Sequence, residues 1–207
     1  MALGKQAKTL TEAQEKAVLG FLADGRQAQR NRVMFLLSVD AGLRSKEIAS
    51  VTWEMVTDAS GALTDEIRLE DTASKGKSGG VVFISKRLGA ELAAFAHTQK
   101  EMTGTIIKSE RRGSMSAQSV TNWFFTLYKR LGYEGCSSHS GRRTAITRWS
   151  RKISSVGGSL RDVQSLARHS SLQMTQRYIE VSEDAMKKVV GQAERVSIGH
   201  SVRFHST

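Results

Sequence analysis

The chain has 207 residues, of which 39% are hydrophobic, and this predicts one domain with a packed core. Its formal charge is +11 and its isoelectric point is about 10.1, so the expected partner is a polyanion. No apolar run approaches the roughly 20 residues of a membrane span, and no N-terminal signal segment is recognisable. A single cysteine, Cys136, excludes an internal disulfide and a cysteine-rich zinc site. We therefore expect a soluble intracellular protein without membrane association.

The first half of the chain predicts three helices, a hairpin and a fourth helix after a loose basic extension at residues 1–10. Thr11 to Gln14 is a capping box, and the helix that it begins carries Ala17, Val18, Phe21 and Leu22 before it ends at Asp24-Gly25. A second helix is predicted from about 27 to 41, broken by Gly42, and Ser45 is expected to cap a short helix that ends at Ala49. Residues 63–69 and 81–84 predict strands joined by a glycine-rich connection, and Ser85 begins the next helix.

The second half predicts a short edge strand at 105–107 and then a series of helices. Their expected ranges are 116–131, 138–152, 159–167, a short helix that ends near Tyr178, and 182–190, followed by a tail at 191–207. Ser170 or Ser171 caps the short helix, whose Leu172 and Met174, with Ile179, are expected to face a core. The fold class is therefore mainly α with a small antiparallel β-sheet (α+β), in one domain.

Two groups of cations in the first half are typical of phosphate binding. In Gly42-Leu-Arg44-Ser-Lys-Glu47, a guanidinium offers paired donors to one phosphate, and Glu47, one turn on, is placed to hold it. The plain alternative is a surface ion pair. Lys75 and Lys77 lie near glycines at the hairpin tip, where a lysine either donates a proton to a reacting group or is simply solvated.

Two more groups lie in the second half. His139 and Arg142 fall one turn apart, and if Ser138 caps their helix, both lie in the first turn, where the helix dipole favours an anion. The alternative is a capping histidine beside a surface arginine. His169 precedes Tyr178 by nine residues, and a tyrosine hydroxyl among cations is a plausible nucleophile toward a phosphate. A lone helical tyrosine is otherwise a half-buried core residue.

Basic residues dominate the stretch from His139 to Tyr178, which holds eight Lys or Arg and one acid, Asp162. Such a surface follows a nucleic-acid backbone rather than reading bases, although a solvated charged face is the alternative. The residues expected to contact DNA, from this stretch and the hairpin tip, are Lys77, Arg143, Arg148, Arg151, Lys152, Arg168 and Arg177.

In this order, Gly-Leu-Arg-x-x-Glu, a hairpin lysine, His-x-x-Arg, and His-Ser-Ser with a tyrosine nine residues after the histidine resemble the tyrosine recombinase (phage integrase) family. The resemblance covers about Thr11 to Val190 and implies that residues 11–190 are the family's catalytic domain. It implies site-specific DNA recombination or integration through a 3′-phosphotyrosine intermediate, with no metal or other cofactor.

The resemblance also implies a role for each matching residue. Tyr178 is the expected nucleophile, Arg44 and Arg142 clamp the phosphate, and His169 bonds the scissile phosphate. His139 transfers a proton. Lys75, in preference to Lys77, protonates the leaving 5′ oxygen, and Glu47 has a supporting role.

The implied partner is double-stranded DNA, bound by a tetramer on two duplexes, in the cytoplasm at the nucleoid. The helix at 182–190 would pack either on a neighbouring copy or on its own core. Since the catalytic pattern begins near Thr11, the family's N-terminal DNA-binding arm is expected to be absent, and an arm-bearing partner protein is a possible substitute.

A second departure from the family's pattern and three alternatives stay open. Glycine usually precedes the family's second histidine, and here Arg168 either adjusts the loop or adds a phosphate contact. A type IB topoisomerase-like relaxase and a non-catalytic DNA-binding accessory protein derived from a recombinase would share much of this residue set. Cys136, three residues before His139, also suggests thiol catalysis, but an inert, partly buried thiol is the simpler interpretation because neighbours in sequence need not meet in space.

Overall fold

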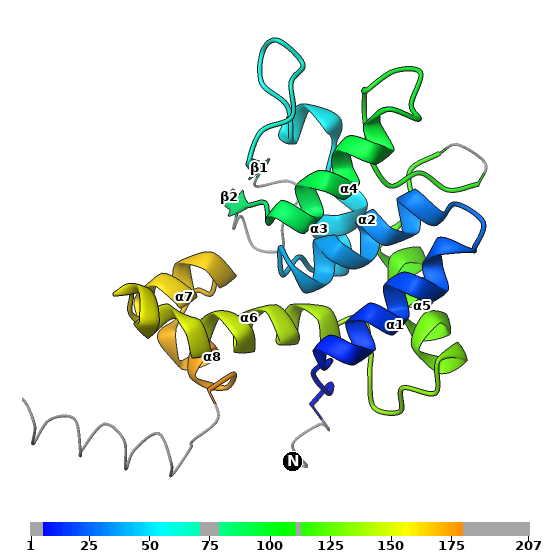
Figure 1. Cartoon of the computed structure of the whole chain (residues 1–207). Helices are drawn as coiled ribbons and strands as arrows, with labels where there is room; N and C mark the ends of the chain where they lie inside the picture. Colours follow the sequence, from blue (N-terminus) through cyan, green and yellow to red (C-terminus); the bar gives the residue numbers. More distant parts are fainter. Residues whose placement is uncertain (1–5, 71–78, 111–112, 180–207) are drawn as a thin grey trace, which may run out of the picture.

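The computed structural model describes residues 6–70, 79–110 and 113–179. In Figure 1 one long helix, α6 (Ser140–Lys152), leads from a larger group of helices to a smaller one. The smaller group is α7 (Leu160–Ala167) and α8 (Leu172–Gln176), reached through a 3-10 turn at Ile153–Val156. The larger group consists of α1 (Glu12–Ala23), α2 (Ala28–Val39), α3 (Ser45–Ser50), α4 (Lys86–Ala96) and α5 (Ala117–Arg130), with a 3-10 turn at Trp53–Met55.

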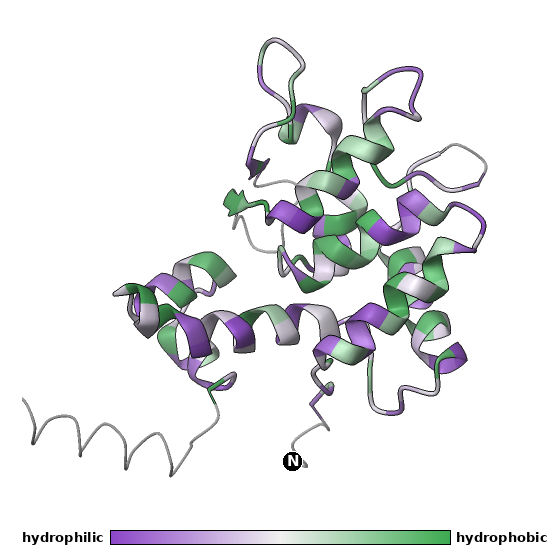
Figure 2. Ribbon diagram, viewed as in Figure 1, coloured by the Kyte–Doolittle hydropathy of each residue, from purple (hydrophilic) through white to green (hydrophobic). Residues whose placement is uncertain are grey.

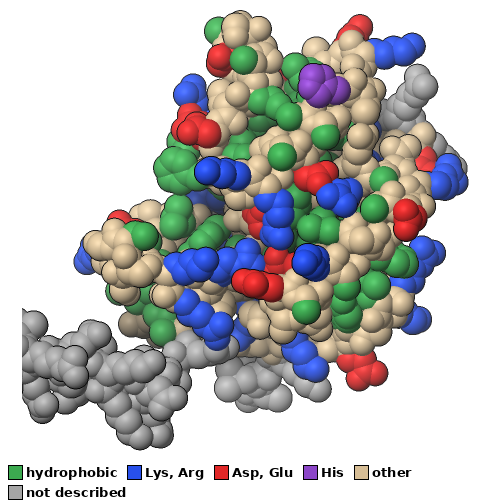
Figure 3. All heavy atoms as spheres, in the orientation of Figure 1, with side chains coloured by type: hydrophobic (Ala, Val, Ile, Leu, Met, Phe, Trp, Pro, Cys, Tyr) green, Lys and Arg blue, Asp and Glu red, His purple; other side chains and the backbone are tan. Residues whose placement is uncertain are grey.

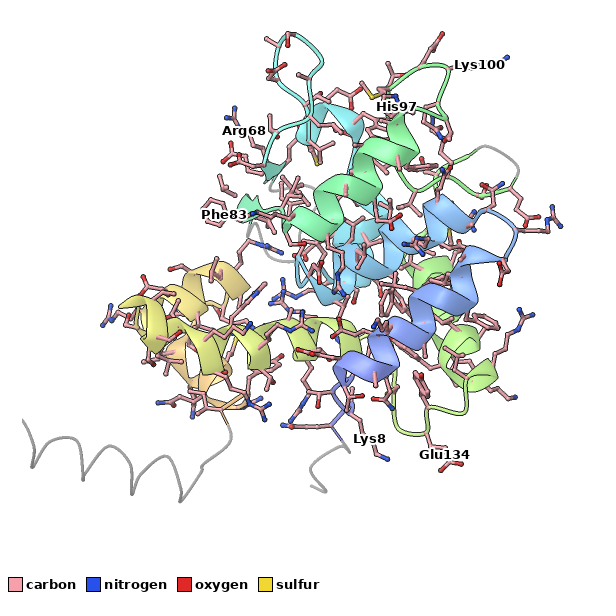
Figure 4. The ribbon with its side chains drawn as sticks, in the orientation of Figure 1. Lys8, Arg68, Phe83, His97, Lys100 and Glu134 are labelled. Carbon is pink, nitrogen blue, oxygen red and sulfur yellow. The ribbon has the colours of Figure 1, made fainter. Side chains whose placement is uncertain are left out.

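The predicted β-hairpin is confirmed as an antiparallel pair, β1 (Glu66–Leu69) and β2 (Gly80–Phe83). Ile67 lies opposite Val82, and both face the core, whereas Phe83 on the other face is 63% exposed and points outward in Figure 4. The strand predicted at 63–69 is shorter because Leu63 forms an isolated bridge with Thr57. The predicted edge strand at 105–107 is wrong, since Thr105 makes only an isolated bridge with Thr52.

The main core is built around α2, in which every residue from Val33 to Val39 is buried. Figure 2 shows the hydrophobic residues gathered on the central helices of the larger group. The largest fully buried side chains include Trp53, Tyr128 and Phe35. A second, small cluster of buried residues, Ile146, Val163 and Ala167, joins α6 to α7. The smaller group therefore depends on few apolar contacts of its own.

Helix starts follow the predicted caps at most positions. Thr11 forms its capping box with Gln14, and the Ser85 and Ser116 hydroxyls cap α4 and α5. Ser171, rather than Ser170, accepts the capping hydrogen bond of α8.

Two predicted caps are wrong. Arg44, not Ser45, occupies the cap position of α3, because the Glu47 carboxylate reaches back to accept from the Arg44 backbone N–H. Ser138 does not cap α6, because the chain is already helical at His139, which takes the cap position.

Several predicted inward residues are exposed. Phe21 is 43%, Met174 37% and Ile179 42% exposed. In their place the helices bury polar side chains, Glu15 on α1 and Thr175 on α8, because each has a polar partner across a helix interface. The expected helix at 182–190 and the tail at 191–207 lie outside the described residues. Within the described ranges, no helix is both long and apolar enough to cross a bilayer.

Candidate active site

Five of the six predicted catalytic side chains meet at one hollow of about 300 Å³, although they come from distant parts of the chain. Arg44 precedes α3, His139 and Arg142 begin α6, His169 follows α7, and Tyr178 follows α8. Lys75 and Lys77 lie outside the described residues. The remaining lining residues are Gln6, Ala7, Arg143, Met174 and Arg177.

Arg142 is the fixed centre of this hollow. It lies in the first turn of α6 and is 4% exposed, and its two terminal nitrogens donate to the backbone carbonyls of Gly42 and Ala167. Those carbonyls belong to the turn after α2 and the end of α7, so one guanidinium ties three segments together. Burial, and next the charge of Arg44, lowers the pKa of Arg142 to about 10, which leaves it cationic at neutral pH.

Glu47 holds Arg44 beside this centre. Arg44 Nη1 donates to Glu47 Oε1 at 2.8 Å, and the Arg44 backbone N–H donates to Oε2 at 2.8 Å. Glu47 is fully buried, and burial by itself opposes its ionisation. The charge of Arg168 and the hydrogen bond from Arg44 outweigh that cost and hold the pKa of Glu47 below its usual value. The Arg44 guanidinium is thus anchored at one nitrogen and still lines the hollow.

His169 and Tyr178 stack face to face. Their ring centroids are 5.4 Å apart with planes inclined by 25°. At the edge of the imidazole, a 2.9 Å hydrogen bond between His169 Nδ1 and Thr175 Oγ1 fixes the ring's orientation. Burial first, and then the charges of Arg142, Arg44 and Arg168, lowers the pKa of His169 to about 4. His169 is therefore a neutral imidazole at pH 7.

Two further cations stand at the mouth of the hollow. The Arg143 guanidinium lies 5.9 Å from the centre of the Tyr178 ring and donates to the Gln6 side chain. Arg177 is exposed at the end of α8, and His139 is also exposed. The hollow is therefore positively charged from its floor at Arg142 to its rim at Arg177.

The other predicted DNA contacts fall in different places. Arg151 and Lys152 are exposed on α6. Arg148 instead pairs with two carboxylates, Glu15 and Asp40, which Arg87 also holds. This cluster joins α1, α2, α4 and α6. In the view of Figure 3, basic and acidic side chains lie close together in the middle of the surface.

Arg168 is nearly buried against Glu47, so a direct phosphate contact would require it to leave that carboxylate.

Sequence reasoning missed three groups that shape the site: the Gly42 and Ala167 carbonyls and the Thr175 hydroxyl. The carbonyls leave no sequence signal, whereas Thr175 is a polar residue on the inner face of a short helix. Cys136 is a half-buried thiol packed against the main core, and it does not line the hollow. In the described part of the chain, no group of three or more His, Cys, Asp or Glu side chains is arranged to hold a metal ion.

The family model described as "Phage integrase family" matches residues 8–185. The chain belongs to the phage integrase family. Among curated members of this family, it is 24% identical over 168 residues to a protein named tyrosine recombinase XerC from Leptospira interrogans. That match covers 79% of this chain and 50% of the relative, so the chain spans about half the length of the curated relatives it matches.

Solved structures of other integrases and recombinases share the fold. The Tn1549 transposon integrase in complex with a circular intermediate DNA superposes with a TM-score of 0.70 at 16% identity, covering 92% of this chain and 67% of that one. XerA recombinase gives 0.67 at 17% identity, over 99% of this chain and 67% of XerA. A lambda integrase dimer bound to a COC′ core site gives 0.62 at 20% identity, over 86% and 51%.

Proposed function

We propose that this chain is the catalytic part of a site-specific recombinase that cuts and rejoins DNA through Tyr178. The observation that carries the proposal is the convergence of Arg44, Arg142, His169 and Tyr178 on one positively charged hollow, from four separate segments. Family membership supports the same reaction class.

In the proposed step, the Tyr178 oxygen attacks the phosphorus of one DNA strand. A bond forms between the tyrosine oxygen and phosphorus, and the bond from phosphorus to the 5′ oxygen breaks. The phenol loses its proton, with the exposed His139 as the proposed acceptor, and the leaving 5′ oxygen gains one, for which Lys75 is the proposed donor. The products are a 3′-phosphotyrosine and a free 5′ hydroxyl, and attack by the hydroxyl of a second strand completes an exchange.

The cations match the charge that develops in this step. Arg44 and Arg142 would donate to the non-bridging phosphate oxygens, where fixed donors are worth about 2.7–4 kcal/mol each by analogy with an oxyanion hole. Since Thr175 can donate to His169 Nδ1, the neutral ring would carry its hydrogen on Nε2 and donate it to the phosphate.

We extend the proposal to the partners. Double-stranded DNA is the proposed substrate, which would place the protein at the nucleoid, and four copies would assemble on two duplexes. An arm-bearing partner protein belongs to the same proposal. The lambda integrase dimer bound to a COC′ core site supports assembly of several copies on DNA.

Covalent trapping tests the proposal. The protein is incubated with a panel of nicked duplexes, in which the 5′ fragment diffuses away after cleavage, and adducts are separated on a denaturing gel. Wild type should form a protein–DNA adduct and Tyr178→Phe should form none, because the nucleophilic oxygen is gone. Tyr133→Phe, which removes a hydroxyl in the main body, is the matched control and should form the adduct.

Two outcomes would contradict the proposal: no wild-type adduct on any duplex, which favours a DNA-binding accessory protein, or an adduct with Tyr178→Phe. Plasmid relaxation without exchange in a two-site assay would instead favour a type IB topoisomerase-like relaxase.

A further inference from the structure

Arg168 has a backbone conformation that its residue type disfavours. It ends α7 with φ 49° and ψ 50°, in the left-handed region, where glycine is the usual residue and a side chain strains the backbone. All three nitrogens of its guanidinium are buried, and none makes a hydrogen bond of good geometry within the described residues, which adds a desolvation cost that only the ion pair of Nη2 offsets. Glycine would avoid both costs, so the arginine side chain must offset them elsewhere.

Within the described part of the chain, Arg168 forms an ion pair with the carboxylate that holds Arg44. Arg168 Nη2 lies 2.7 Å from Glu47 Oε2, and the two side chains are 6% and 0% exposed. The Arg168 stem passes beneath the first residue of β2, where a Cβ built on Gly80 would lie 3.7 Å from Arg168 Cδ. Arg168 does not line the hollow, so it stands behind Glu47 and not beside the proposed phosphate.

The Glu47 carboxylate contacts two arginines, and this limits the number of hydrogen bonds that the Arg44 guanidinium makes with it. An isolated arginine and carboxylate prefer two parallel hydrogen bonds, which would use both donors of one edge of the Arg44 guanidinium. Here Oε2 is occupied by Arg168 and the Arg44 backbone N–H, and Arg44 reaches only Oε1, through Nη1 alone. The rest of its guanidinium is left for a ligand in the hollow.

We propose that Arg168 is a positioning residue: by occupying Glu47 Oε2 it keeps Arg44 in a single-nitrogen contact and so leaves the Arg44 donors free for the scissile phosphate. Charge supports the same arrangement. Arg44 and Glu47 alone would form a neutral pair, whereas the trio with Arg168 keeps one net positive charge beside Arg142. The inference rests on the proposed function for its effect on cleavage, but the pairing of Arg44 can be tested without any reaction.

The first test is structural and needs no DNA. A crystal structure of Arg168→Gly should show Arg44 rotated into a two-nitrogen contact with Glu47, while Arg168→Lys, whose ammonium still reaches Oε2, should keep the single Nη1 contact. Arg168→Gln serves in place of the glycine variant if that variant does not fold. If Arg44 keeps its single contact when residue 168 has lost its charge, the inference is overturned.

The second test is the rate at which the protein forms the covalent adduct on a nicked duplex of the kind described above. Arg168→Gly should be slower by roughly 10- to 100-fold, less than the 10²–10³-fold cost of removing an oxyanion donor outright, because Arg44 is displaced and not removed. Arg168→Lys should restore most of the rate. Lys129→Ala, on the exposed side of α5, removes the same unit of charge and should react like wild type.

The two tests separate this inference from the proposed function. If wild type forms no adduct but Arg44 re-pairs in Arg168→Gly, the positioning role stands and the proposed function fails. A wild-type rate for Arg168→Gly, or a rate for Arg168→Lys as low as that of the glycine variant, would overturn the inference in an active enzyme.

Discussion

At the scale of single residues, burial and the neighbouring guanidinium groups together set the protonation of the site. Arg142 is bound by carbonyls and not by a carboxylate, so its charge is not cancelled by a direct partner. Together with Arg44 and Arg168 it surrounds His169, on which Tyr178 stacks. Burial first, and then the same positive charge that would bind a phosphate, lowers the pKa of His169 and keeps it neutral, so His169 is suited to hydrogen bonding rather than to acting as a cation.

This neutral histidine predicts acid sensitivity. The pKa of His169 is about 4 in the folded protein and near 6.5 in an unfolded chain, so between these values only the unfolded state binds the proton. The contribution of His169 to the free energy of unfolding is complete above pH 6.5 and is lost as pH falls toward 4. The loss is at most about 3.5 kcal/mol, because the pKa differs by about 2.5 units and each unit is worth about 1.4 kcal/mol.

Urea denaturation of wild type and His169→Gln, at several pH values across this window, measures the effect. The glutamine variant should show a weaker dependence on pH, because a glutamine does not titrate. Equal pH dependence of the two proteins would contradict the prediction, since the exposed His97 and His139 are common to both.

At the scale of elements, the helix pair that carries the proposed nucleophile has little core of its own. The buried residues that join α6 and α7 are Ile146, Val163 and Ala167, against which Tyr178 packs, whereas the main core fills the space among α1 to α5. Regions with few buried apolar contacts open locally at low free energy. We therefore expect α7 and α8 to exchange backbone hydrogens faster than α2.

A matched pair of core substitutions tests this difference. Ile146 and Ile107 are both fully buried, one in each cluster, and replacing either by valine should cost about 0.5–1.5 kcal/mol. Ile146→Val should speed hydrogen exchange mainly in residues 160–179 and slow adduct formation. Ile107→Val should lower global stability without a selective change there, and identical exchange maps for the two variants would contradict the proposed local weakness.

At the scale of the whole molecule, the basic residues behind the net charge of +11 have two different roles. Arg148 and Arg87 form ion pairs with the carboxylates of Glu15 and Asp40 and so join helices. Arg143 and Arg177 stand at the mouth of the hollow, while Arg151 and Lys152 are exposed on α6. DNA bound through this second set would be held by its phosphates.

Binding through phosphates predicts a strong dependence on salt. The affinity for duplex DNA should fall steeply between about 50 and 200 mM salt, with a log–log slope that counts the phosphate contacts. Arg177→Ala should reduce that slope by about one, whereas Lys129→Ala should leave it unchanged. Fluorescence anisotropy on labelled duplexes measures both, and an affinity that does not change with salt would rule out the basic surface as the DNA-binding face.

The sequence by itself determined the local features of this protein. Hydrophobic spacing and capping residues predicted most helices and the hairpin, because the Thr11 capping box or the glycine after α2 acts within a few residues. The order of the basic motifs indicated the family, since the reaction needs those residue types. Only the tertiary structure decided that Arg148 is a structural cation, that Glu15 and Thr175 are buried, and that Arg168 shares Glu47 with Arg44. Arg148 and Glu15 lie 133 residues apart, and such a separation leaves no local pattern to read. Thr175 and His169 are only six residues apart, but their contact depends on how the chain turns between α7 and α8.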